Sequence, residues 1–182
     1  LILLGETKGH LGASLYAREL LGLDGEDAGP PPPVDLEAEK RNADFVRSLI
    51  EQGLVNAVHD VSDGGIACAA AEMALASGLG IGCDVTNLMP ENIILPIGWD
   101  GISYYSWVLF GEANGCYLAA IDKDQHGQIL GLAKLAQVSV TGKKLNSGWF
   151  SEEEHNILIF CDAGGPLDID VPLAKLREAH EG

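Results

Sequence analysis

Residues 59–65 read His59-Asp60-Val61-Ser62-Asp63-Gly64-Gly65. An apolar run precedes them and an alanine-rich run follows, which predicts a buried strand over 54–58, an acidic turn and then a helix. Asp63 is expected to cap that helix, because its carboxylate can accept the free amide hydrogens of the first turn. Gly64 and Gly65 carry no Cβ, so the backbone of the turn can approach a neighbouring group closely.

The same turn has features of a combined anion and cation site. A helix N-terminus that follows glycines binds anions through its free amides, but Asp60 and Asp63 would repel a bare phosphate. A divalent cation between carboxylate and phosphate would remove this conflict, since hard cations prefer oxygen ligands. On spacing alone, a capped helix at a strand-to-helix turn is the favoured interpretation, and a metal–phosphate site is the alternative.

The whole chain has the composition of a folded, strongly acidic protein. It contains 182 residues, 47% of them hydrophobic, with a formal net charge of -16. This length fits a single domain over 1–182 with a sizeable core. The negative charge argues against nucleic acid or an anionic membrane as a partner, and no apolar run is long enough to span a bilayer. A phosphorylated ligand would need metal, glycine-loop amides or a second domain to supply positive character.

The cysteines and the first residues bear on location and completeness. Four cysteines, at positions 68, 83, 116 and 161, show no Cys-x-x-Cys spacing, which predicts reduced thiols and no zinc site or redox pair. No signal or transit peptide is visible, and we expect a cytoplasmic protein. The opening run Leu1-Ile2-Leu3-Leu4 has the character of a strand interior, so we expect the chain to be a piece of a longer protein.

Hydrophobic periodicity and turn residues give the expected order of the other elements. Asp35 is expected to cap a long helix, and Asn114-Gly115 predicts a hairpin because both residues tolerate positive φ. Together the elements predict an α+β fold, a mixed β-sheet with helices packed on it. Strands are expected over 1–4, 54–58, 81–85, 107–110, 116–121, 138–145 and 157–160, and helices over 13–21, 36–52, 66–73, 125–136 and 172–180.

Four landmarks follow one another along the chain. They are Leu4-Gly5-Glu6-Thr7 with Leu11-Gly12-Ala13-Ser14, the turn 59–65, Phe110-Gly111-Glu112, and the ending 171–182. In this order they resemble the C-terminal domain of the phosphoribosylformylglycinamidine synthase family, in its short bacterial form. The resemblance spans nearly the whole chain.

The resemblance implies a fold like the C-terminal domain of aminoimidazole ribonucleotide synthetase, with 1–182 as the C-terminal fragment of a longer synthetase. The family is a ligase of purine biosynthesis that uses ATP, Mg²⁺ and ammonia to convert formylglycinamide ribonucleotide into the amidine. An amide oxygen is activated by phosphoryl transfer and then displaced by ammonia. The implied partners are a glutaminase subunit, a small accessory subunit and the N-terminal domains of the same chain.

The resemblance also suggests site residues. Asp60 matches a magnesium-binding aspartate, and Gly64, Gly65, Lys8 and Glu112 are the candidates for cofactor binding. Each has a plainer alternative: a surface carboxylate, a tight glycine connection, or an exposed turn residue. No catalytic residue is assigned, because the catalytic histidines of the family lie in its N-terminal parts.

His59 is expected to be an orienting, hydrogen-bonded histidine and not a general base. The chain also departs from the family pattern, since it lacks an arginine near Cys116 and has Lys143 where a glycine pair is expected. These departures favour a structural cleft. Two alternatives therefore stay open: a non-catalytic module that packs against the enzyme and holds a structural nucleotide, or a related kinase of the same superfamily.

Overall fold

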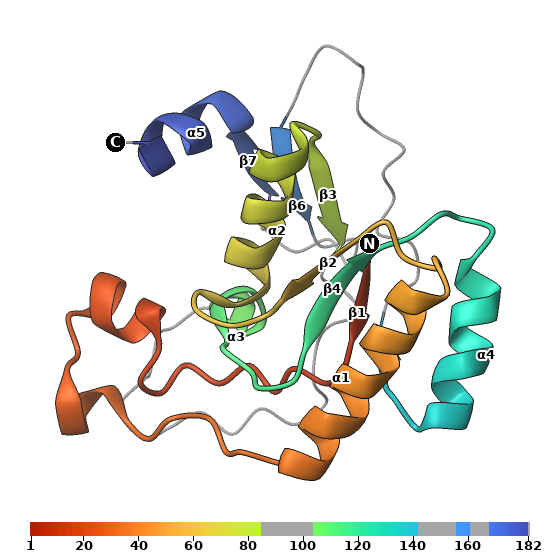
Figure 1. Ribbon diagram of the computed structural model, residues 1–182. Helices are drawn as coiled ribbons and strands as arrows, with labels where there is room; N and C mark the ends of the chain where they lie inside the picture. The colour runs from red at the N-terminus through yellow and green to blue at the C-terminus, as the bar shows by residue number, and fades with distance from the viewer. Residues whose placement is uncertain (85–103, 142–155, 161–167, 182) are drawn as a thin grey trace.

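The computed structural model describes residues 1–84, 104–141, 156–160 and 168–181. Within them the chain forms two β-sheets and five α-helices (Figure 1). The antiparallel sheet has the order β2-β4-β1-β5, and the second, mixed sheet has the order β3-β6-β7. The strands are β1 (Ile2–Leu4), β2 (Ala57–Asp60), β3 (Ile81–Asp84), β4 (Tyr117–Ala120), β5 (Val140–Thr141), β6 (Asn156–Phe160) and β7 (Asp168–Pro172).

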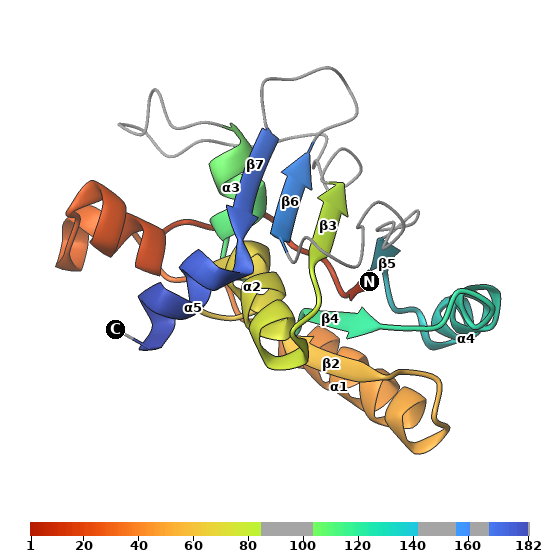
Figure 2. The same cartoon turned by 90° about the horizontal axis from the view of Figure 1, so that it is seen from above.

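Helices cover both faces of the four-stranded sheet. α1 (Leu36–Glu51) and α4 (His126–Ala136) lie on one face, and α2 (Gly65–Ser77) lies on the other, beside the second sheet (Figures 1 and 2). A short π-helix (Tyr16–Leu20) and a 3₁₀-helix (Gly25–Ala28) precede the first α-helix. The α-helices are α1 (Leu36–Glu51), α2 (Gly65–Ser77), α3 (Tyr104–Phe110), α4 (His126–Ala136) and α5 (Leu173–Glu181). The predicted α+β class, with helices packed on mixed strands, is confirmed.

The alternation of side chains along β1 explains the two-sided core. Successive residues of a strand point to opposite faces of the sheet. Ile2 and Leu4 accordingly join one buried cluster with residues of α1 and α4, whereas Leu3 joins the cluster formed with α2 and α3. Three consecutive buried residues therefore hold two helical layers together.

Helix α1 follows its sequence pattern closely. The Asp35 carboxylate accepts the amide hydrogen of Ala38 at 3.0 Å, as expected of an N-cap. Phe45, Val46 and Leu49 are buried on one side of the helix. A polar residue, Asn42, is buried on the same side.

Two strand predictions around the central motif are wrong. The apolar run 107–110 is part of α3, which packs against α2, and it continues through 111–116 into β4 without a hairpin. Trp107, Val108 and Leu109 are all buried, and a short helix that is buried on most sides has no amphipathic period to distinguish it from a strand. The predicted buried strand at 54–58 is instead the edge strand β2, displaced to 57–60 and exposed at both ends.

Other predictions are confirmed with small shifts, or lie outside the described residues. Strand β3, strand β6 and helix α4 lie where they were expected. β7 was missed, and it takes up Pro172, where a helix was expected to begin. Residues 142–145 of the strand expected over 138–145, including Lys143, lie outside the described residues. In the described parts of the chain, no helix combines the length and the apolar character that a membrane span needs.

Candidate functional site

Glu112 connects the two glycine-rich segments that the sequence singled out. Its Oε1 atom accepts the amide hydrogen of Leu15 at 2.8 Å and that of Gly64 at 2.9 Å. Its own amide donates to the carbonyl oxygen of His10 at 2.8 Å. One residue therefore holds the loop 5–15 and the turn 60–65 in a fixed relation, although they are far apart in the sequence.

Glycines allow these segments to come close together. Gly65 has a φ of +68°, and a Cβ on it would lie 2.7 Å from the Leu109 carbonyl oxygen. A Cβ on Gly111 would lie 2.5 Å from the Gly9 Cα. Such separations are shorter than side chains tolerate, so the tight turn and the end of α3 require residues without a Cβ. The close backbone approach expected at Gly65 is thus made to the protein itself.

The amides of the turn are also used within the protein. The Gly64 amide donates to Glu112, and the Gly65 amide donates to the Ser62 carbonyl oxygen at 3.1 Å. The prediction that Asp63 caps α2 is wrong, because the N-cap is Gly64 in a left-handed conformation, without a side-chain capping bond. Asp63 therefore lies one residue before the N-cap.

Two adjoining pockets share the loop 112–114 as a wall. One pocket, of about 330 Å³, is lined by Lys8, Asn42 and Glu112 among others. The second, of about 260 Å³, is lined by Asp60, Asp63 and Glu112 among others. The structure therefore brings Lys8 and Glu112 together, and Asp60 and Glu112 together, whereas Lys8 and Asp60 line different pockets.

Sequence reasoning missed Asn42. It is 7% exposed, and its Nδ2 atom donates to the Gly115 carbonyl oxygen at 3.0 Å. Its Oδ1 atom has no hydrogen-bond partner among the described residues. The signal in the sequence was a polar side chain spaced three and four residues before Phe45 and Val46, on the apolar face of α1.

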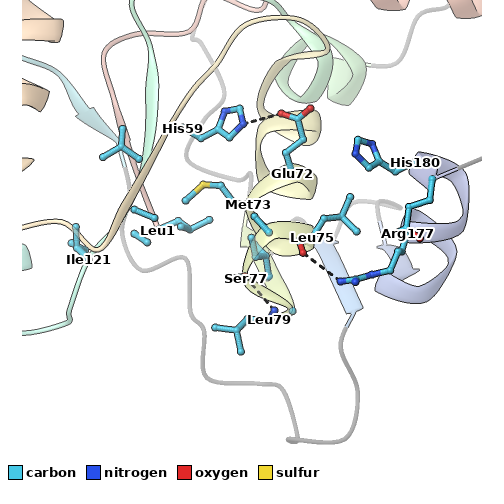
Figure 3. A pocket seen from close by; sticks show the side chains of 18 residues that line it. Leu1, His59, Glu72, Met73, Leu75, Ser77, Leu79, Ile121, Arg177 and His180 are labelled. Carbon is cyan, nitrogen blue, oxygen red and sulfur yellow. Dashed lines mark hydrogen bonds and ion pairs between the residues drawn. The ribbon is translucent and has the colours of Figure 1, made fainter.

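The two histidines near the site are held by neighbours. His59 Nε2 lies 2.8 Å from Glu72 Oε2 (Figure 3), and His59 Nδ1 lies 2.7 Å from the Asp60 carbonyl oxygen. The expectation that His59 is hydrogen-bonded is confirmed, and its orienting role stays a prediction. His10 Nε2 lies 2.7 Å from the Pro30 carbonyl oxygen, so it connects the loop 5–15 to the run of four prolines at 30–33.

Burial makes the cysteine beside the site a poor nucleophile. Cys116 is buried, and its thiol donates to the Glu6 carbonyl oxygen at 2.9 Å. Loss of solvation, with a smaller contribution from the Glu6 charge, raises the pKa of the Cys116 thiol to about 11. Desolvation also raises the pKa of Cys68, which lies against Gly64. Both free thiols remain protonated at neutral pH.

The residues present fit a magnesium ion only if a ligand supplies most of its oxygens. The Asp60 side chain is 66% exposed at the end of β2. In the described ranges no group of three or more His, Cys, Asp or Glu side chains is arranged to hold a metal. Magnesium commonly binds through one or two carboxylates together with phosphate oxygens and water. Asp60 suits that arrangement, and Lys8 offers a positive charge to phosphate from the neighbouring pocket.

Comparison with known proteins identifies the family. Residues 1–150 match the family model described as AIR synthase related protein, C-terminal domain. The chain is 38% identical over 182 residues to phosphoribosylformylglycinamidine synthase subunit PurL of Parvibaculum lavamentivorans, covering all of this chain and 21% of the relative. The same subunit of Mesorhizobium japonicum is 42% identical over 173 residues, covering 95% and 20%. This chain therefore spans about a fifth of the length of these relatives.

The fold is shared with a solved structure. T. maritima PurL complexed with FGAR superimposes with a TM-score of 0.68 at 18% sequence identity, covering 96% of this chain and 27% of that one. At this identity the likeness concerns the fold alone, whereas the family model covers most of the sequence. The chain belongs to the family of AIR synthase related proteins, as an example of their C-terminal domain.

Proposed function

We propose that this chain is the C-terminal domain of a phosphoribosylformylglycinamidine synthase, a ligase of de novo purine biosynthesis. The observation that carries the proposal is the 38% identity to a PurL subunit over the entire chain. The parent enzyme would use ATP and ammonia derived from glutamine to convert formylglycinamide ribonucleotide into formylglycinamidine ribonucleotide. The fold likeness to T. maritima PurL, which has been solved with FGAR and with ATP, supports this assignment.

Within that enzyme we assign binding and positioning roles to this domain. When bound, Mg-ATP supplies the phosphoryl group that activates the amide oxygen of the substrate. Asp60 would hold the magnesium ion through its exposed carboxylate, and Lys8 would attract phosphate. Gly64 and Gly65 remain candidates for contact with the cofactor, although their amides are already bonded within the protein. Their contribution would then come from close packing of the turn, and not from free donors.

Two further features of the proposal concern partners and location. A structure of PurLQS from Thermotoga maritima is known, and it supports the presence of partner subunits in the parent enzyme. We propose that these partners are a glutaminase and a small accessory protein. The reduced thiols of Cys68 and Cys116 are compatible with a cytoplasmic enzyme.

One observation favours the second candidate, a non-catalytic module that completes the fold. Glu112, expected to contact a ligand, uses Oε1 to hold two backbone segments, and buried Asn42 donates to the carbonyl oxygen of Gly115, three residues further along the chain. Calorimetry with Mg-ATP on the 182-residue chain separates the candidates. Weak or undetectable binding, with no synthetase turnover, is expected of the isolated domain if it is a module that completes the fold. Sub-micromolar binding would show an independent nucleotide site and would contradict that second candidate.

The function itself is tested in the longer synthetase that contains this chain. Incubated with formylglycinamide ribonucleotide, Mg-ATP and ammonium, it should release ADP and phosphate and form the amidine. If no amidine forms from formylglycinamide ribonucleotide or from any other carboxamide ribonucleotide, the ligase assignment is contradicted. ATP-dependent phosphorylation of a different small molecule would instead favour a superfamily kinase.

A further inference from the structure

A third pocket, larger than the two that Glu112 lines, lies away from that residue. It has a volume of about 910 Å³ and lies where β2, β3, α2 and α5 meet (Figure 3). Its lining is mainly apolar and includes Leu1, Met73, Leu79 and Ile121. Leu79 is 64% exposed. The apolar side chains that line this cavity stay in contact with water unless another group fills it. An exposed apolar surface of this kind is typical of a site where another segment or a ligand binds.

Two sheet edges face this cavity. In the described parts of the chain, β2 is the last strand of the four-stranded sheet and β3 is the last strand of the other sheet. Ala57, Val58 and His59 of β2 line the cavity, together with Ile81 and Gly82 of β3. An edge strand presents unpaired N–H and C=O groups, which are a template for another extended segment. The cavity thus combines an apolar surface with backbone groups able to hold a strand.

The position of Leu1 indicates which segment could reach it. Leu1 lines the cavity and directly precedes β1, in which Ile2 pairs with Ala119. The next residue of β4, Ala120, pairs with Ala57 of the edge strand. Residues upstream of Leu1 would therefore leave the sheet beside the cavity. The chain covers only about a fifth of its PurL relatives, so most of each relative lies outside the match.

We propose that this cavity is the docking groove for the segment that immediately precedes Leu1 in the longer synthetase. The proposal rests on the proposed function, since it requires that longer chain. Because β4 lies between β1 and β2, the residues next to Leu1 cross the end of β4. The residues before them bind as an extended strand along the free edge of β2, and alternate side chains of that strand fill the apolar cavity. Backbone hydrogen bonds to β2 give it a fixed register, and the His59–Glu72 pair lies at the rim (Figure 3).

Thiol labelling tests the occupant. Leu79→Cys is introduced into three forms: the 182-residue chain, that chain with about ten upstream residues added, and the full synthetase. About ten residues are enough to cross the end of β4 and to form one short strand. Maleimide labelling at position 79 is followed by peptide mass spectrometry, which separates it from the native cysteines. Leu135→Cys, on α4 and 84% exposed in the native residue, is the matched control.

Labelling of Leu79→Cys should be slower by about tenfold or more in both longer forms, while Leu135→Cys reacts equally in all three. Equal rates for Leu79→Cys in all three forms would overturn the proposal. So would protection that appears only in the full synthetase or only after partner subunits are added, because the occupant would then be another domain or another protein.

A second measurement covers the case in which Leu79→Cys fails to fold. Hydrogen exchange of the unsubstituted forms should show slower exchange across 57–60 once the upstream residues are present, and unchanged exchange would overturn the proposal. Turnover of the full synthetase is assayed in parallel. Turnover without protection refutes the groove alone, whereas protection without amidine formation refutes the proposed reaction and leaves the groove standing.

Discussion

Glu112 accepts the amide hydrogen of Gly64 at 2.9 Å across 48 positions of sequence. The same oxygen accepts the amide hydrogen of Leu15, 97 positions away. A carboxylate that bonds two backbone amides contributes more than a neutral acceptor, and its loss leaves both donors without a partner. The geometry of the candidate site therefore depends on Glu112 whether or not a ligand touches it.

We expect Glu112→Ala to lower the free energy of unfolding by about 2–4 kcal/mol, because two hydrogen bonds to a charged group are lost. Glu112→Gln keeps an acceptor oxygen and should lose about half as much. Urea denaturation of the 182-residue chain measures both variants. Exposed Glu178 provides the control, and an effect of Glu112→Ala no larger than that of Glu178→Ala would show that the two bonds are not maintained in solution.

The contact of Gly65 with the end of α3 can be separated from its backbone conformation. Gly65→Ala should lower the free energy of unfolding by about 2–4 kcal/mol, since it combines a positive φ with a Cβ placed 2.7 Å from the Leu109 carbonyl oxygen. Gly78 has a φ of +69° and open space around it, so Gly78→Ala should cost only about 1 kcal/mol. Equal losses by thermal denaturation would mean that the close contact is relieved in the variant.

The buried thiol of Cys116 predicts a specific pH dependence. Its pKa is raised from 9.0 to about 11 in the folded protein, so the protonated form stabilises the fold fully below pH 9. That stability is lost as the pH rises from about 9 to 11. The raised pKa values of Cys68 and Tyr117 act in the same direction.

Urea midpoints measured between pH 8 and 11 should fall less steeply for Cys116→Ala than for the native chain. Cys68→Ala is the matched variant, because it keeps the contribution of Cys116. Parallel curves for Cys116→Ala and the native chain would contradict the assignment of this pH dependence to Cys116.

The proposed metal role of Asp60 is tested in the longer synthetase. Asp60→Asn should raise the Mg²⁺ concentration needed for turnover or nucleotide retention by about tenfold or more, because a carboxylate ligand is replaced by a weaker amide oxygen. Asp124→Asn, in an exposed turn, should leave it unchanged. If Asp60→Asn has the Mg²⁺ requirement, nucleotide content and melting temperature of the native enzyme, Asp60 is a surface carboxylate only.

Local rules predicted the elements whose signals are contained in a few neighbouring residues. Asp35 as an N-cap and the helix α4 needed only capping chemistry and periodicity. The run 107–110 could not be assigned in this way, because its helical form depends on packing against the small side chains of α2. The edge position of β2 depends likewise on strand pairing, which no local pattern reports.

The sequence by itself determined the family, through the motif 59–65 and its companions in order, and it determined the acidic, mixed α+β character of the chain. Only the tertiary structure decided what Glu112, Gly64 and Gly65 do within the fold. Their partners lie tens of residues away, and the amides that a sequence motif offers to a ligand can be taken by a carboxylate of the protein itself. Long-range contacts of this kind arise from the packing of all the elements together, so the spacing of neighbouring residues in the sequence does not predict them.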